Sequence, residues 1–139
     1  MEHIFTRLKE LHSETPVTPS LPSEEEIKDK ENKYGINFPP SYKLYLLKFS
    51  NLNVGTFEPY MLNRHQFPYI DLDSNVEDAR KYGLPDHLFP FMTHNGDYFC
   101  FNLNSEGPEY EVLFWSHDFP EEKWKNFMDW VENCWIKEA

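Results

Sequence analysis

The sequence predicts a single α+β domain in which helices flank an antiparallel β-sheet meander. Helical periodicity and helix caps dominate residues 3–51, short aromatic and β-branched runs fill the middle of the chain, and an amphipathic pattern returns after residue 120. The length of 139 residues suits one domain. We therefore treat 1–139 as one unit, with an N-terminal helix and proline-rich loop at 1–22 and the core at 23–139.

The N-terminal part of the chain is predicted to contain two helices joined by a loop. Residues 3–13 place apolar side chains on one helical face, and the loop at 15–23 contains three prolines. Ser23 and Glu26 have the S-x-x-E spacing of a capping box, so a second helix is expected to begin near Glu24.

The stretch KYGINFPPSYKLYLLKFSN, residues 33–51, specifies the end of that helix and the start of a third. Gly35 can adopt the left-handed conformation that ends a helix. Pro39 and Pro40 cannot continue a helix, but a proline fits the first turn of a new one. The predicted buried face of the third helix consists of Tyr42, Tyr45, Leu46 and Phe49.

The middle of the chain is predicted to form two strands and a short helix. Residues 56–62 and 67–72 are rich in aromatic and branched side chains, and their prolines favour strand ends or sheet edges. Residues 75–83 are expected to form a helix closed by Gly83.

A three-stranded meander is predicted next. Asn95-Gly96 is a hairpin turn signal that separates a strand at 89–93 from one at 98–103, and a loop leads to a third strand at 110–116. Residues 120–137 have the pattern of an amphipathic helix. Its apolar face contains Trp124, Phe127, Met128, Val131 and Trp135.

The chain is acidic, and the acidic residues are concentrated in one region. With 13 basic and 24 acidic residues the net charge is −11. Residues 71–122 hold 12 of the acids but only the bases Arg80 and Lys81. This balance argues against binding to nucleic acid, because phosphate contacts need clustered Lys and Arg. The acidic region is either a solubilising surface or a docking face for a basic protein.

The sequence contains no familiar catalytic motif. The phosphate loop and the G-x-S-x-G, H-E-x-x-H and C-x-x-C patterns are absent. His94 with Asp97, and His117 with Asp118, could meet at one end of the sheet and form a metal or acid–base site. The favoured interpretation is structural, with Asp97 bonding turn amides and His117 bonding a neighbouring loop. We expect no enzymatic activity, no metal and no cofactor.

The sequence also bears on location and redox state. No stretch reaches the roughly 18 to 20 apolar residues of a membrane span, and the N-terminus lacks the apolar core of a signal peptide. A cytoplasmic protein without membrane contact is expected. Cys100 and Cys134 lie far apart in apolar runs, so they are predicted to be buried thiols and not a disulfide or metal pair.

Two stretches resemble the signatures of a known superfamily. The first is E-x-x-I followed by KYGINFPPSYKLYLLKFSN, and the second is FPFMTHNGDYFCFNLNSEGPEYEVLFWSHD, which ends in W-x-H-D. Together they resemble the SUKH superfamily, which includes the yeast cell-wall-assembly regulator and many bacterial immunity proteins. The resemblance spans residues 20–136. The departures, such as the single Gly55 where relatives often have a glycine pair, lie in loops where partner choice is expected to be set.

The resemblance implies a non-enzymatic module that binds a protein. It implies an immunity protein that neutralises a cognate toxin domain of a polymorphic or contact-dependent system, with nuclease toxins as frequent targets. A toxin that engages nucleic acid needs a basic site, which the acidic region could cover. The candidate contact residues are Asp71, Asp73, Glu77, Asp78, Glu109, Glu111 and Asp118, with Tyr98 and Tyr110 as aromatic anchors.

Two other interpretations stay open at the level of sequence. One is a regulatory or scaffolding protein that binds an endogenous partner, as the eukaryotic members suggest. The other is an enzyme or ligand binder that uses His94, Asp97, His117 and Asp118.

Overall fold

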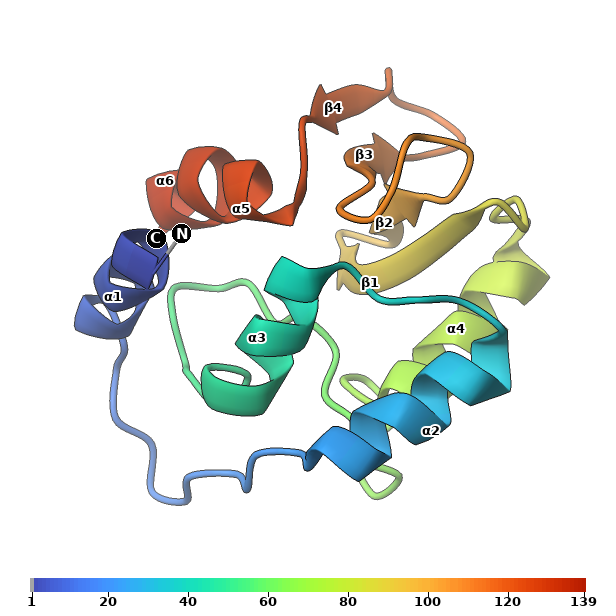
Figure 1. The fold of residues 1–139 in the computed structure, drawn as a ribbon. Coiled ribbons are helices and arrows are strands. Elements are labelled where there is room, and N and C mark those ends of the chain that lie inside the picture. Colours follow the sequence, from blue (N-terminus) through green and yellow to red (C-terminus); the bar gives the residue numbers. More distant parts are fainter. Residues whose placement is uncertain (1) are drawn as a thin grey trace.

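A four-stranded antiparallel sheet with helices on both faces organises the protein (Figure 1). The computed structural model describes residues 2–139. The strands lie in the sheet in sequence order, and they are β1 (Leu88–His94), β2 (Asp97–Asn102), β3 (Glu111–Trp115) and β4 (Glu122–Trp124). The helices are α1 (Glu2–Glu10), α2 (Glu24–Tyr34), α3 (Pro40–Lys48), α4 (Leu72–Tyr82) and a C-terminal run of α5 (Phe127–Trp130), η1 (Val131–Trp135) and α6 (Ile136–Glu138). The predicted α+β class is confirmed.

Alternation along β2 sends side chains into two separate cores. Phe99 and Phe101 enter the main core, which the sheet shares with α3 and α5. Tyr98 and Cys100 point to the opposite face, where they pack with Ala79 of α4. The sheet therefore lies between two layers of helix, and α4 covers the outer face.

The predicted bend between α2 and α3 is confirmed. Gly35 has φ 66° and ψ 34°, the left-handed C-cap conformation. The buried Glu31 carboxylate then accepts the N–H of Phe38 at 2.8 Å, and Lys43 lies 3.5 Å from the same oxygen. The orientation of α3 is fixed by this buried acceptor as well as by the local caps.

The β1–β2 hairpin also forms as predicted. Asn95 and Gly96 both have positive φ, 51° and 82°, as a two-residue turn between twisted strands requires. The pairing shifts register between Pro90 and Met92. At this bulge the Phe91 carbonyl accepts an N–H from outside the sheet.

The strands predicted at 56–62 and 67–72 are wrong. Residues 56–62 and 67–71 form turns and irregular loop, Leu72 is the first residue of α4, and one isolated bridge joins Met61 to Asp71. Pro59 and Pro68 cannot donate to a strand ladder. The segment is held by individual bonds instead. Tyr60 links it to β1, because its N–H donates to the Phe91 carbonyl at 2.9 Å and its hydroxyl is hydrogen-bonded to the Thr93 hydroxyl.

The C-terminal helix begins later than the predicted residue 120. Trp124 belongs to β4 and pairs with Val112, which makes the meander four-stranded. Asn126 caps the helix by accepting the Asp129 N–H at 2.9 Å. The apolar face predicted from the 3.6-residue period included Trp124, which reaches the same core from a strand.

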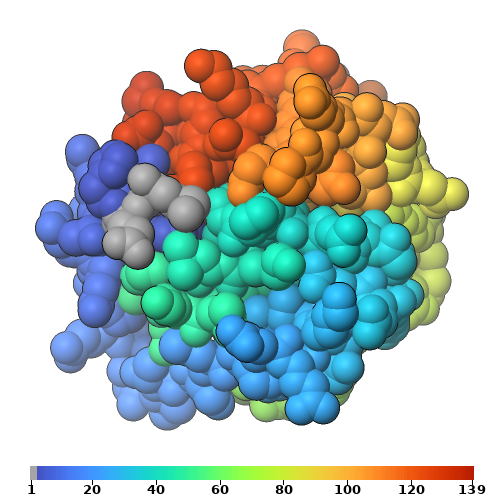
Figure 2. All heavy atoms as spheres, viewed as in Figure 1, coloured from blue at the N-terminus to red at the C-terminus, as the bar shows by residue number. Residues whose placement is uncertain are grey.

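The N-terminal segment follows the edge of the molecule from the C-terminal helices to α2 (Figure 2). Phe5 of α1 stacks on Phe49 with ring centroids 4.8 Å apart. Beyond α1, the Ser13 N–H donates to the Asn53 carbonyl at 2.8 Å. Residues 15–20 thus form a strap across the loop that follows α3.

Both cysteine thiols are free, as predicted. Cys100 is buried and Cys134 is half-buried, and burial raises the pKa of each thiol. No described helix is both long and apolar enough to cross a bilayer.

Candidate protein-binding site

The nine predicted contact residues fall into three groups in the structure. Each group occupies a different part of α4 or of the sheet, and only one group combines exposed carboxylates with aromatic rings. The groups are Asp71, Asp73 and Glu77 on or next to the first turns of α4; Glu109, Tyr110 and Glu111 at the start of β3; and Asp78, Tyr98 and Asp118 near the end of α4 and the opposite end of β3.

Asp71 has a structural role. It is 1% exposed, and it caps α4 by accepting the Ser74 N–H at 3.1 Å. Its other oxygen accepts the Arg64 N–H at 2.7 Å. A carboxylate enclosed in this way is unavailable to a partner, and the capping bond explains why α4 begins three residues before the predicted start.

Asp73 joins α4 to α2. Its carboxylate accepts hydrogen bonds from Lys30 and from the Tyr34 hydroxyl, and Lys33 lies 3.2 Å away. Burial would raise the pKa of Asp73, but these hydrogen bonds outweigh it and hold the pKa below its usual value of 3.8.

Asp73→Asn is expected to lower the free energy of unfolding at pH 7 by about 1–3 kcal/mol, because charge-assisted bonds are lost. Since the folded-state pKa is lowered, this stabilisation is fully present above the unfolded pKa and is lost as the pH falls through the folded value. Urea unfolding of the wild-type protein and of the variant from pH 7 to pH 2.5 should therefore show that the difference between their free energies of unfolding becomes smaller below about pH 4. A difference that is constant across this range would contradict the assignment.

The second group is also engaged within the protein. Glu109 accepts the Ser41 N–H at 3.0 Å and the Ser41 hydroxyl, so a distant loop caps α3, whose own N-cap residue Pro39 provides no side-chain bond. Glu111 lies 3.8 Å from Lys123 on β4. Tyr110 is half-buried against Gly107.

The third group lies beside an aromatic cluster at the end of α4. Tyr82 is the centre, with ring centroids 6.0 Å from Tyr98, 6.2 Å from Trp115 and 4.8 Å from His117. Trp115 and His117 are 4.6 Å apart. Tyr82 is 43% exposed, so the cluster reaches the surface. We call the set of Asp78, Tyr82, Tyr98, Trp115, His117 and Asp118 the aromatic–acidic patch.

The charge of the aromatic–acidic patch is negative. Asp78 and Asp118 are exposed, and no described residue forms an ion pair with either. The nearby Arg80 is turned inward and donates to the carbonyls of Pro85 at 2.7 Å and Leu88 at 2.8 Å. Burial, and then the negative charge of Asp78, raise the pKa of Tyr98.

Sequence reasoning missed Tyr82, Trp115 and His117 as members of a surface cluster. Tyr82 follows Lys81 on a short helix, where an aromatic side chain is ordinarily assigned to the core. Two sequence features pointed to them. The W-x-H-D motif begins at Trp115, the last residue of β3, and the Tyr-Gly pair found at the end of α2 recurs at 82–83.

The two histidine–aspartate pairs do not converge on one site. The His94 ring lies 5.0 Å from Phe57 and 5.6 Å from Phe99, on the main-core face of the sheet. His117 packs on Tyr82 and Trp115 on the other face, and its Nε2 lies 2.8 Å from the Tyr82 carbonyl. Among residues 2–139, no three His, Cys, Asp or Glu side chains are grouped as metal ligands.

Gly83 lies between α4 and the His117 ring of the aromatic–acidic patch. It caps α4 with φ 104°, and a Cβ at this position would lie 3.4 Å from the His117 ring. Gly83→Ala is expected to lower the free energy of unfolding by about 1–2 kcal/mol, since a left-handed conformation strains alanine. Thermal unfolding measures the effect. Gly96→Ala, with φ 82° and no atom near the added Cβ, is the matched control for backbone strain alone.

Comparison with known proteins identifies the family. The chain belongs to the SMI1-KNR4 cell-wall family, SUKH_5, whose model matches residues 1–136. The predicted SUKH membership is thereby confirmed. A crystal structure of a protein from Pseudomonas syringae pv. tomato is similar, with a TM-score of 0.85, 28% sequence identity and 99% coverage of both chains. No curated protein matches the chain significantly.

Membership of this family supports a protein-binding or immunity-type role at the level of the family. It does not identify a partner. The geometry of the aromatic–acidic patch is therefore the basis for a more specific function.

Proposed function

We propose that this protein is a non-enzymatic immunity protein that binds and neutralises a basic toxin domain through the aromatic–acidic patch. The observation that carries the proposal is the exposed Tyr82 ring packed against three other rings, with the unpaired carboxylate of Asp78 on the same helix. Tyrosine and tryptophan provide large contact areas with few rotatable bonds.

The charge around the patch suits a cationic partner. Asp78 and Asp118 belong to the region 71–122, which holds 12 acidic and two basic residues. Opposite charges speed the encounter of two proteins, whereas desolvated aromatic contacts slow their separation. Of the nine predicted contact residues, Asp78 and Asp118 remain as exposed members of the proposed site, whereas Tyr98 is 6% exposed and packs beneath the Tyr82 ring. Glu77 lies nearby on α4, where it pairs with Lys81 at 3.1 Å.

Co-expression with the product of the neighbouring gene tests this function. If that product is toxic, the wild-type protein is expected to restore growth and to form an isolable complex with it. A Tyr82→Ala/Asp78→Lys variant with an unchanged melting temperature is expected to lose both effects. Full protection by that variant would contradict the proposed surface.

A regulatory role is the competing outcome of the same experiment. If the neighbouring gene encodes no basic toxin and the protein instead captures a housekeeping protein, the immunity function is contradicted, and the scaffold function suggested by the family's cell-wall description is favoured.

A further inference from the structure

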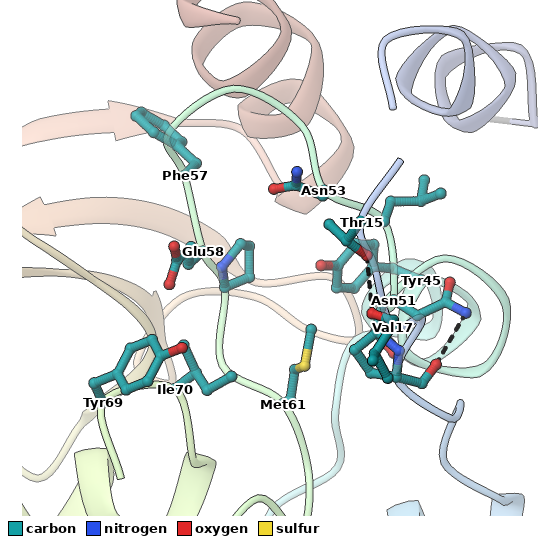
Figure 3. Close-up of a pocket in the computed structure, with 14 residues that line it drawn as sticks. Thr15, Val17, Tyr45, Asn51, Asn53, Phe57, Glu58, Met61, Tyr69 and Ile70 are labelled. Carbon is teal, nitrogen blue, oxygen red and sulfur yellow. Dashed lines mark hydrogen bonds between the residues drawn. The ribbon is translucent and has the colours of Figure 1, made fainter. Parts of the chain in front are cut away.

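A cavity of about 170 Å³ lies between the N-terminal strap and the loops on either side of residue 60. It shares no lining residue with the aromatic–acidic patch. Figure 3 shows Glu58 and Tyr69 on one side of it and Thr15, Val17 and Asn51 on the other. None of these residues belongs to the predicted acidic region. The cavity is of a size to hold one long side chain.

Two of the hydroxyl groups that line the cavity already donate their hydrogen within the protein. The Thr15 hydroxyl donates to the Val17 carbonyl at 2.9 Å, and the Ser50 hydroxyl donates to the Leu46 carbonyl at 2.6 Å. Each hydroxyl has a single hydrogen, so its oxygen can only accept a further bond.

The two amide side chains are oriented in the same sense. The Asn51 amide nitrogen donates to the Pro19 carbonyl, and that of Asn53 donates to the Ser13 carbonyl, both at 3.3 Å. Each amide nitrogen thus donates one of its two hydrogens to the N-terminal segment, and each amide oxygen stays available as an acceptor. With the Thr15 and Ser50 oxygens, the lining offers several acceptors, which suit a ligand rich in hydrogen-bond donors.

The charge carried by the residues that line the cavity is negative. Glu58 is the charged residue among those that line the cavity, and no described residue forms an ion pair with it. Tyr69 is 67% exposed at the same cavity. A carboxylate next to an exposed aromatic ring is suited to a planar cation, which can pair with the one and stack on the other.

We propose that this cavity receives one arginine side chain of a protein partner. The guanidinium group has five N–H donors and no acceptor, which suits the Glu58 carboxylate and the acceptor oxygens of the lining, and its flat face can stack on Tyr69. The aliphatic part of the side chain would lie against Val17, Met61 and Ile70. This inference rests on the proposed function for the source of the arginine, but its chemistry can be tested without the partner.

Titration of the full-length protein with acetyl-Gly-Arg-Gly-amide, followed by amide chemical shifts, is the test. Shifts are expected at residues 15–19, 51–53 and 57–61. The same peptide with citrulline in place of arginine keeps the shape but lacks the charge. Its affinity is expected to be lower by about fivefold or by more. Absence of shifts at these residues, or equal binding of the two peptides, would overturn the proposal.

Two variants and one further probe complete the test. Glu58→Gln should weaken binding of the arginine peptide about fivefold, whereas the control Glu106→Gln, an exposed carboxylate outside the cavity, should not change it. Agmatine is the free guanidinium probe. If agmatine binds and the peptide does not, the protein source is refuted. Neither result depends on the aromatic–acidic patch, so failure here is distinguishable from failure of the proposed function.

Discussion

Tyr42→Ala is expected to lower the free energy of unfolding by about 3–5 kcal/mol, whereas Tyr42→Phe should leave it unchanged or raise it. The Tyr42 ring is fully buried. Five aromatic rings lie around it with centroids 5.0 to 6.3 Å away, and they belong to Phe38, Tyr45, Phe91, Phe101 and Phe127. Alanine would leave a large cavity where α3, α5 and the sheet meet.

The Tyr42 ring stabilises the fold, whereas its buried hydroxyl group is expected to destabilise it. The Tyr42 Oη atom is buried without a hydrogen-bond partner in the structure, and burial raises the pKa of Tyr42. Phenylalanine keeps the ring contacts and removes the cost of an unpaired polar group. Urea unfolding of the three proteins measures both effects. A Tyr42→Phe variant destabilised by more than about 1 kcal/mol would show that the hydroxyl is satisfied.

If the protein binds the proposed toxin, Tyr82→Ala is expected to weaken that binding by about 30-fold, the effect of a hot-spot residue. Its ring contacts Tyr98, Trp115 and His117, so its removal separates the aromatic cluster at the point where it meets solvent. Because Tyr82 is 43% exposed, the fold should tolerate the change.

A matched control is available for this substitution. Leu11 is 39% exposed and lies just after α1, outside both the aromatic–acidic patch and the proposed arginine cavity. Leu11→Ala removes exposed apolar area and should leave affinity unchanged. If both substitutions weaken binding equally by calorimetry, general loss of apolar surface explains the effect and Tyr82 is no anchor.

Features fixed by a few adjacent residues could be predicted from the sequence. The capping box at Ser23, the left-handed cap at Gly35 and the Asn95-Gly96 turn depend on backbone conformations that those residue types favour. The main-core side of β2 was likewise predicted by alternation of Phe99 and Phe101 with their neighbours.

Features that depend on distant contacts could not be predicted. The cap of α3 comes from Glu109, which is 68 residues away from Ser41. Residues 56–62 have the composition of a strand, but no partner strand lies beside them. Clustered acids in the sequence did not become one surface, because Asp71 and Asp73 are used to hold α4 in place.

The candidate site shows the same distinction. Asp78, Tyr98 and Asp118 were named from charge and aromatic content, but Tyr82, whose ring packs on Tyr98, became apparent as a member of the site only once α4 was placed on the outer face of the sheet.

Calorimetric titration of the proposed toxin partner, the product of the neighbouring gene, into the wild-type protein and into an Asp78→Lys/Asp118→Lys variant tests the central claim most directly. If the aromatic–acidic patch meets a basic surface, the variant should bind at least tenfold more weakly, and the loss should diminish as salt is added. The control Glu106→Lys/Glu138→Lys makes the same change of charge at exposed positions elsewhere. Unchanged affinity of the first variant, with its fold intact, would contradict the account.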